Sequence, residues 1–194
     1  MTDRNLSPID QGLDDAIALA TWLRDTERDS GAIATIASHL AGVLKAGGRV
    51  LTCGNGGSLC DAMHFAEELS GRFRNDRPAL AAQAMADPAH LTCVANDYGF
   101  ERVFSRGVEA WGKAGDALLV FSTSGKSPNL IAAVEAARAR GLSVVGLLGR
   151  DGGALRNACD HVIVVPGATS DRIQEVHIKC AHLMIGGIEQ ALFP

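Results

Sequence analysis

Two kinds of hydrophobic pattern divide the chain near residue 47. Before that point, apolar side chains recur three and four residues apart, as Ile33, Ile36, Leu40 and Leu44 do. This spacing places them on one side of a helix. The pattern predicts two helices between about Ile9 and Ala46, ahead of any strand.

After residue 48, short apolar runs alternate with segments of helical spacing. The runs predicted as strands are 50–53, 79–84, 117–121, 144–148 and 161–165. The predicted helices are 59–73, 89–111 with a break near Gly99, 128–140, 154–158 and 171–193. Such alternation is typical of a parallel sheet with helices on both faces, and right-handed crossovers make it doubly wound. The sequence therefore predicts an α/β fold with a five-stranded, flavodoxin-like sheet.

Composition narrows the class of protein. Hydrophobic residues make up 47% of the 194 positions, and the net charge is −4 with scattered basic residues, which argues against a nucleic-acid surface. No apolar run approaches the roughly 20 residues of a membrane span, and Met1–Asn5 does not resemble a signal peptide. The five cysteines form no CxxC pair, which indicates reduced thiols. We expect a cytoplasmic protein that binds neither nucleic acid nor a membrane.

The loop Gly54–Ser58 follows the first predicted strand and precedes a helix. Glycines let the backbone approach a ligand closely, and the free N–H groups of a helix start favour an anion. The alternative is a tight turn with Ser58 as the helix N-cap. A dinucleotide fingerprint is excluded because Leu59 stands where its third glycine would be.

The loop Ser122–Ser127 follows the most apolar strand, and Pro128 opens the next helix. Proline at the first helical position makes Ser127 the expected N-cap. Hydroxyls clustered at a helix N-terminus suit a phosphate, although a merely polar turn remains the alternative. A nucleoside-triphosphate loop is rejected because Val120 replaces its first glycine.

Titratable side chains lie on two of the predicted helices. His64 and Glu68 are four residues apart, so they are neighbours that can share a metal ion or a substrate. The alternative is a solvated face on which Glu68 pairs with Arg72. On the closing helix, spacing does not choose between His177 and His182 as the functional histidine.

A resemblance to a known family runs over essentially the whole chain. It is carried by Gly54–Ser58, Asp61–Glu68, Gly71–Phe73, Asn96–Gly99, Ser122–Ser127 and Asp171–Glu175 with His182. In combination, these motifs resemble the signature of the phosphoheptose isomerases, whose domain type is the sugar isomerase (SIS) domain. The resemblance implies a single SIS domain over 1–194, with N-terminal helices over 1–47 and an α/β core over 48–194.

The resemblance also implies an activity. It is the interconversion of D-sedoheptulose 7-phosphate and D-glycero-D-manno-heptose 7-phosphate through an enediol, the first step towards activated heptoses for bacterial surface polysaccharide. Glu68 would be the base that moves a proton between the first two carbons, and His182 its partner acid and base. Substrate would contact Asn55, Gly56, Gly57, Glu68, Asn96, Asp97, Ser122, Thr123, Ser124, Ser127 and Gln174.

A cofactor and an assembly are implied as well. One zinc ion per subunit would be bound by His64, Glu68, Gln174 and His182. The protein would be a homotetramer with active sites at subunit contacts. His and carboxylate ligands are usual for zinc, whereas glutamine is a poor one.

Two other functions stay open. One is a non-catalytic SIS-domain protein that binds sugar phosphates or regulates replication through protein contacts. Relatives of that kind keep the two loops but would lack counterparts of Glu68 and His182, and this chain has both. The other is an isomerase that acts on a different phosphosugar.

Overall fold

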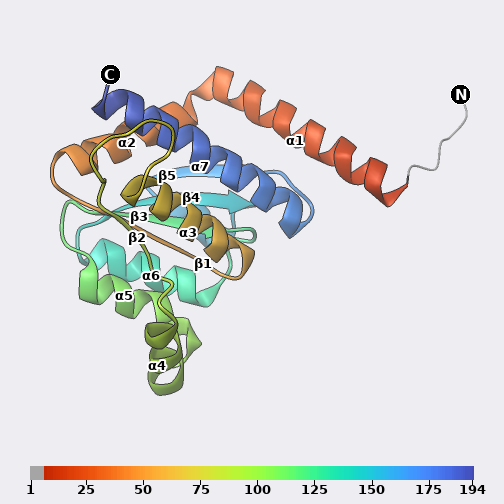
Figure 1. Ribbon diagram of the computed structural model, residues 1–194. Helices are drawn as coiled ribbons and strands as arrows, with labels where there is room; N and C mark the ends of the chain where they lie inside the picture. The colour runs from red at the N-terminus through yellow and green to blue at the C-terminus, as the bar shows by residue number, and fades with distance from the viewer. Residues whose placement is uncertain (1–6) are drawn as a thin grey trace, which may run out of the picture.

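Two long helices precede the sheet, as predicted. The computed structural model describes residues 7–194, and in it α1 (Pro8–Ser30) and α2 (Ala32–Lys45) meet at Gly31. A capping box starts α1, because the Asp10 N–H donates to Ser7 Oγ at 3.2 Å and the Ser7 N–H donates to the Asp10 carboxylate. Helix α1 projects from the body of the molecule, whereas α2 lies against the sheet (Figure 1).

Five parallel strands form one sheet in the order β2-β1-β3-β4-β5. Their bounds are β1 (Val50–Gly54), β2 (Ala82–Ala84), β3 (Ala117–Ser122), β4 (Ser143–Gly149) and β5 (His161–Val165). The order reverses between β1 and β3, as in a doubly wound sheet, so the predicted fold class is confirmed. The edge strand β2 is shorter than the predicted run 79–84, because the Leu80 N–H donates to the Leu69 carbonyl at the end of a helix.

Helices cover both faces of the sheet. One layer holds α2, α3 (Gly57–Ser70) and α7 (Ser170–Leu192). The other layer holds α4 (Pro88–Tyr98), α5 (Val103–Trp111) and α6 (Pro128–Ala139). Two short 3-10 helices are also present: η1 (Phe100–Arg102) lies between α4 and α5, and η2 (Gly153–Asn157) lies between β4 and β5. No helix in residues 7–194 has an apolar stretch long enough to cross a membrane.

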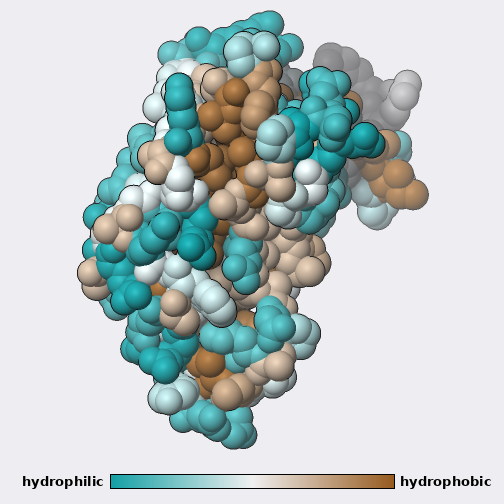
Figure 2. All heavy atoms as spheres, turned by 60° about the vertical axis from the view of Figure 1, so that its left-hand side comes forward, coloured by the Kyte–Doolittle hydropathy of each residue, from teal (hydrophilic) through white to brown (hydrophobic). Residues whose placement is uncertain are grey.

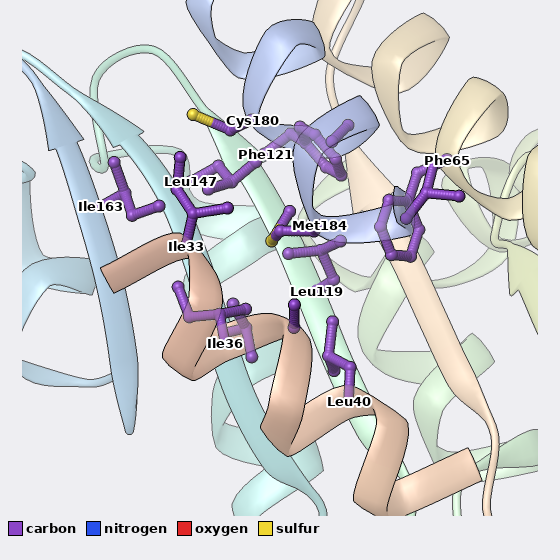
Figure 3. Packing of buried hydrophobic residues seen from close by; sticks show 14 of the residues in the cluster. Ile33, Ile36, Leu40, Phe65, Leu119, Phe121, Leu147, Ile163, Cys180 and Met184 are labelled. Atoms are coloured by element: carbon purple, nitrogen blue, oxygen red, sulfur yellow. The ribbon is translucent and has the colours of Figure 1, made fainter. Parts of the chain in front are cut away.

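Each strand feeds both hydrophobic layers because successive side chains point to opposite faces. In β3, Leu119 and Phe121 pack in the α2–α3–α7 layer, and Leu118 packs in the α5–α6 layer. Figure 3 shows the first of these cores, where Leu40 and Met184 lie beside Leu119. Outside, hydrophilic residues cover most of the face in Figure 2, and apolar residues gather in a strip in its upper half and in smaller groups at the right and near the bottom.

Both ends of α3 differ from the sequence prediction. Gly56 occupies the N-cap, so Ser58 lies buried inside the first turn and is not the cap. At the other end, the Gly71 N–H donates to the Glu67 carbonyl and the helix ends at Ser70. Arg72 therefore lies beyond the helix, and Glu68 has His64 rather than Arg72 as its ionic neighbour within residues 7–194.

Candidate functional site

A polar cavity of about 200 Å³ opens at the carboxyl ends of β1 and β3. These neighbouring strands flank the reversal in strand order, where ligands bind in open α/β sheets. The cavity is lined by Asn55, Ser58, Phe121, Ser122, Thr123, Ser124, Ser127, Leu130, Ser170 and Gln174. Hollows of about 220 and 260 Å³ lie beside β2 and beside α1, but their linings lack such a cluster of hydroxyls.

The segment Ser122–Ser127, called the serine loop below, is held by its own hydroxyls. Ser122 Oγ accepts from the Gly125 N–H at 3.0 Å, and Ser124 Oγ accepts from the Lys126 N–H at 3.3 Å. Gly125 has φ +64°, and a Cβ there would overlap the Gly152 carbonyl oxygen, so only glycine fits. The loop is thus fixed against residues 151–153.

Ser127 stands at the N-cap of α6, as predicted, and its side chain makes no capping hydrogen bond in the described structure. Ser127 is one of the residues that line the cavity. Hydroxyls and backbone N–H groups therefore meet at a helix N-terminus, an arrangement that favours an anion. Lys126 turns to the exposed Asp151 at 3.1 Å, and this hydrogen bond lowers the pKa of Asp151.

The glycine-rich loop is fixed by partners far away in the sequence. The side-chain amides of Asn55 and Asn129 exchange two hydrogen bonds of 2.9 and 2.8 Å. Gln174 Nε2 donates to Ser58 Oγ at 3.3 Å, and a Cβ on Gly57 would lie 2.6 Å from Gln174 Oε1. The sequence analysis did not predict that Ser58 and Asn129 hold this loop. Asn129 directly follows Pro128 at the start of a helix, a position that could have marked it as a candidate site residue.

Three titratable side chains meet where α3 lies beside α7 (Figure 1). His64 Nε2 lies 3.0 Å from His182 Nε2 and 3.3 Å from Glu68 Oε1. One ligand atom from each of the three side chains lies within 4.8 Å of the other two. Phe73 stacks on the His182 ring at 5.8 Å between centroids.

Burial and charge act on this cluster. Burial lowers the pKa of His182, and the neighbouring His64 lowers it further, while Glu68 opposes the shift. One turn before His64, burial raises the pKa of Asp61 to about 6. Asp61 Oδ2 is buried and has no hydrogen-bond partner among residues 7–194. Asp61 opens the motif Asp61–Glu68, but the sequence analysis assigned it no role.

The other histidine of α7 lies in the core. His177 is fully buried, and its Nε2–H donates to the Leu148 carbonyl at 3.1 Å. Burial lowers the pKa of His177 to about 4. The structure therefore separates the two histidines between which spacing did not choose: His182 faces α3, and His177 faces the sheet.

The three-residue cluster fits a zinc ion on geometric grounds. Four ligands about 2.1 Å from zinc lie about 3.4 Å from each other in a tetrahedron, close to the 3.0 and 3.3 Å that separate His64 Nε2 from His182 and Glu68. Two imidazoles and one carboxylate form a usual set for a catalytic zinc, with one position left open. The fourth predicted ligand, Gln174, lies two turns earlier on α7, and its amide contacts Ser58.

Two of the predicted substrate contacts lie elsewhere. Asn96 and Asp97 are exposed on α4, and the Asn96 side-chain amide donates to Asp97 at 2.7 Å. Neither residue lines the cavity, and α4 lies at the opposite end of the molecule from α7 (Figure 1). Their contact with a substrate stays a prediction.

Comparison with known proteins gives a consistent result. The SIS domain family matches residues 15–149. A phosphoheptose isomerase of Fusobacterium nucleatum is 57% identical over 82% of each chain, and one of Klebsiella pneumoniae is 54% identical over 91% of this chain and 92% of its own. The solved phosphoheptose isomerase of Neisseria gonorrhoeae has a TM-score of 0.87 and 38% identity, covering 94% of this chain and 97% of its own. That of Francisella tularensis has the same TM-score and 36% identity, covering 95% and 100%.

Proposed function

This chain belongs to the phosphoheptose isomerase family of SIS-domain proteins, and we propose that it interconverts D-sedoheptulose 7-phosphate and D-glycero-D-manno-heptose 7-phosphate. One observation carries the proposal: the hydroxyl-lined cavity and the His64–Glu68–His182 cluster share the same two helices. From Ser58 to His64, α3 advances about 9 Å. That distance is comparable with the length of an extended sugar phosphate. One substrate could therefore reach from the cavity, which would hold its phosphate, to the cluster, which would act on its first two carbons.

The serine loop would hold the phosphate. Its hydroxyls and backbone N–H groups are neutral donors at the start of α6, and the helix dipole favours a negative charge there. Gln174 lines the cavity from α7 and would contact the sugar between the phosphate and the reacting carbons.

The proton transfers would fall to Glu68 and His182. In the direction from ketose to aldose, the Glu68 carboxylate removes a proton from carbon 1 and returns it to carbon 2. His182 donates a proton to the carbonyl oxygen on carbon 2 and accepts one from the hydroxyl on carbon 1. The lowered pKa of His182 keeps its imidazole neutral near pH 7, the form that can both donate and accept.

We also propose one zinc ion per subunit, held by His64, Glu68 and His182, with Gln174 as the fourth predicted ligand. When bound, zinc would supply a Lewis acid that stabilises the negative charge of the enediolate oxygen. The non-catalytic alternative is disfavoured, because the closely similar relatives are named isomerases.

The proposed homotetramer would use α1. This helix leaves Ile9, Leu13 and Ile17 exposed at a spacing of four residues, so they form one apolar stripe. A second copy of the chain would cover that stripe. Light scattering of the wild type and of Leu13→Asp tests this assembly. An unchanged molecular mass in the variant would show that α1 does not form the subunit contact.

Incubating the purified protein with sedoheptulose 7-phosphate and following the aldose product tests the activity. Glu68→Gln should lower turnover by about 10²- to 10⁴-fold, the usual effect of losing a general base. Glu67→Gln is the matched control, because Glu67 is exposed on the neighbouring side of α3. No turnover by the wild type would refute the function, and a larger loss in the Glu67 variant would refute the assignment of the base.

A further inference from the structure

Arg77 is buried in the segment that joins α3 to β2. Only 3% of its side chain is exposed. Its Nη2 donates to the Glu68 carbonyl at 2.6 Å, and its Nη1 donates to the Leu69 carbonyl at 2.7 Å. Weaker contacts at 3.2 and 3.3 Å join Nη1 to the carbonyls of Pro78 and Gly71. One guanidinium therefore gathers the last carbonyls of α3.

The end of α3 needs such a donor. The last four carbonyls of a helix have no partner inside it, and their partial negative charge favours a cation. Gly71 satisfies the Glu67 carbonyl, but the last turn of α3 contains no basic residue. Arg77 supplies the missing charge and donors from outside the helix.

The same guanidinium also reaches α7. Arg77 Nε donates to Glu189 Oε1 at 2.9 Å, and the Glu189 side chain is 13% exposed. Glu189 lies two turns after His182 on α7. Arg77 thus joins the backbone of Glu68 to the helix that carries His182.

A buried ion pair is by itself weak evidence for stability, since well-packed apolar residues often do as well. Apolar residues do not, however, bind two helix carbonyls and a carboxylate on another helix at once. We propose that Arg77, together with Glu189, is a positioning residue that fixes Glu68 relative to His182. The proposal rests on the roles given above to those two side chains.

Arg77→Lys tests the idea while keeping the charge. A lysine has no planar fork, so it does not hold Glu68, Leu69 and Glu189 together. We expect kcat to fall about 10- to 100-fold, as for a misplacement of about 1 Å, with KM changed less than about threefold. Arg140→Lys is the control, because Arg140 donates to the Gly112 carbonyl at the end of α5, remote from α3 and α7. Its kcat should stay within about twofold of the wild type.

Glu189→Gln is a milder second variant that keeps an acceptor oxygen for Arg77. We expect kcat to fall about three- to tenfold, and this variant decides the matter if Arg77→Lys does not fold. The affinity for Co²⁺, followed by its visible absorption, gives a readout apart from turnover. It should weaken about tenfold in both variants and stay unchanged in Arg140→Lys.

The outcomes separate the two levels of the argument. Lower unfolding temperatures with unchanged kcat and Co²⁺ affinity would make Arg77 merely structural and overturn the proposal. A wild type that binds Co²⁺ but does not isomerise sedoheptulose 7-phosphate would refute the proposed function, and the Co²⁺ affinities would still decide on positioning. A wild type with neither property would overturn both.

Discussion

His177 and His182 lie five residues apart on α7 and face directions about 140° apart around its axis. His177 is enclosed by the sheet, with the Leu148 carbonyl and the Phe121 ring as its neighbours. His182 is half-exposed and lies against His64 on α3. Burial lowers the pKa of both, and within residues 7–194 titratable groups shift the pKa of His182 alone.

The difference shows that the position of a histidine on a helix face decides what its chemistry can serve. A buried imidazole with one carbonyl partner is a core side chain that must stay neutral. An imidazole at the contact of two helices, with a carboxylate and a second imidazole nearby, can bind a metal or move a proton. The first three experiments below set one histidine, or its surroundings, against the other, and the fourth tests the serine loop, which has no titratable group in the comparison.

The largest contrast should appear in turnover. His182→Gln should lower kcat by about 10²- to 10⁴-fold, because the partner acid and base is lost. His177→Gln should keep kcat within about threefold when measured below its unfolding temperature. Steady-state kinetics on sedoheptulose 7-phosphate makes the comparison, and equal losses in the two variants would contradict it.

Stability against pH should show the reverse contrast. The pKa of His177 is about 4 in the folded protein against 6.5 for the ordinary group, so between these values the unfolded chain binds a proton that the folded chain does not. Stability should therefore fall as the pH drops from 6.5 to 4, by about 3 kcal/mol in total from this residue. Urea unfolding of the wild type and of His177→Gln isolates the contribution, since the variant should lack it. Parallel curves for the two proteins would refute this account of His177.

Metal content should depend on the histidines at the contact of α3 and α7, and not on His177. His64→Ala should weaken zinc binding by more than about tenfold, since even partners of a ligand cost 10- to 100-fold. His177→Ala should keep its zinc, and a chelator should lower the activity of the wild type until zinc is added back. Elemental analysis decides, and full activity in rigorously metal-free protein would leave Glu68 and His182 as an organic acid–base pair.

The smallest effect is expected where no group titrates. Ser124→Ala removes one neutral donor from the serine loop, and a hydrogen bond is worth about 0.5–1.5 kcal/mol, so KM should rise about two- to tenfold. Ser143→Ala, at the start of β4 beside His39, should leave KM unchanged. Calorimetry should also show poor binding of unphosphorylated sedoheptulose. Equal binding of the phosphorylated and unphosphorylated sugars would refute the proposal that the serine loop binds the phosphate.

The sheet could be predicted from sequence because each strand is a short apolar run that carries its own signal. Leu118 and Leu119 both read as buried and both are, on opposite faces. Where prediction was inaccurate, a distant group had intervened. Strand β2 is short because the Leu80 N–H binds Leu69, a partner that no local pattern reveals.

The site was predictable only in part for the same reason. Spacing along one helix made His64 and Glu68 neighbours. The position of the serine loop directly after a strand placed it at the carboxyl end of the sheet. The pairs Asn55 with Asn129 and His64 with His182 are 74 and 118 residues apart, and no periodicity links them. The resemblance to a family singled out His182, and the fold explains the choice, because it brings His182 to 3.0 Å from His64.

That separation of 118 residues has a consequence for how the protein is made. A chain synthesised from its N-terminus, at about 5–20 residues per second, reaches the serine loop several seconds before it reaches His182. During that interval, Leu119 and Phe121 have no α7 to cover them, so the growing chain presents an apolar surface that chaperones recognise. The cavity wall formed by Ser170 and Gln174 and the His64–Glu68–His182 cluster would therefore be completed together, when α7 folds onto the sheet.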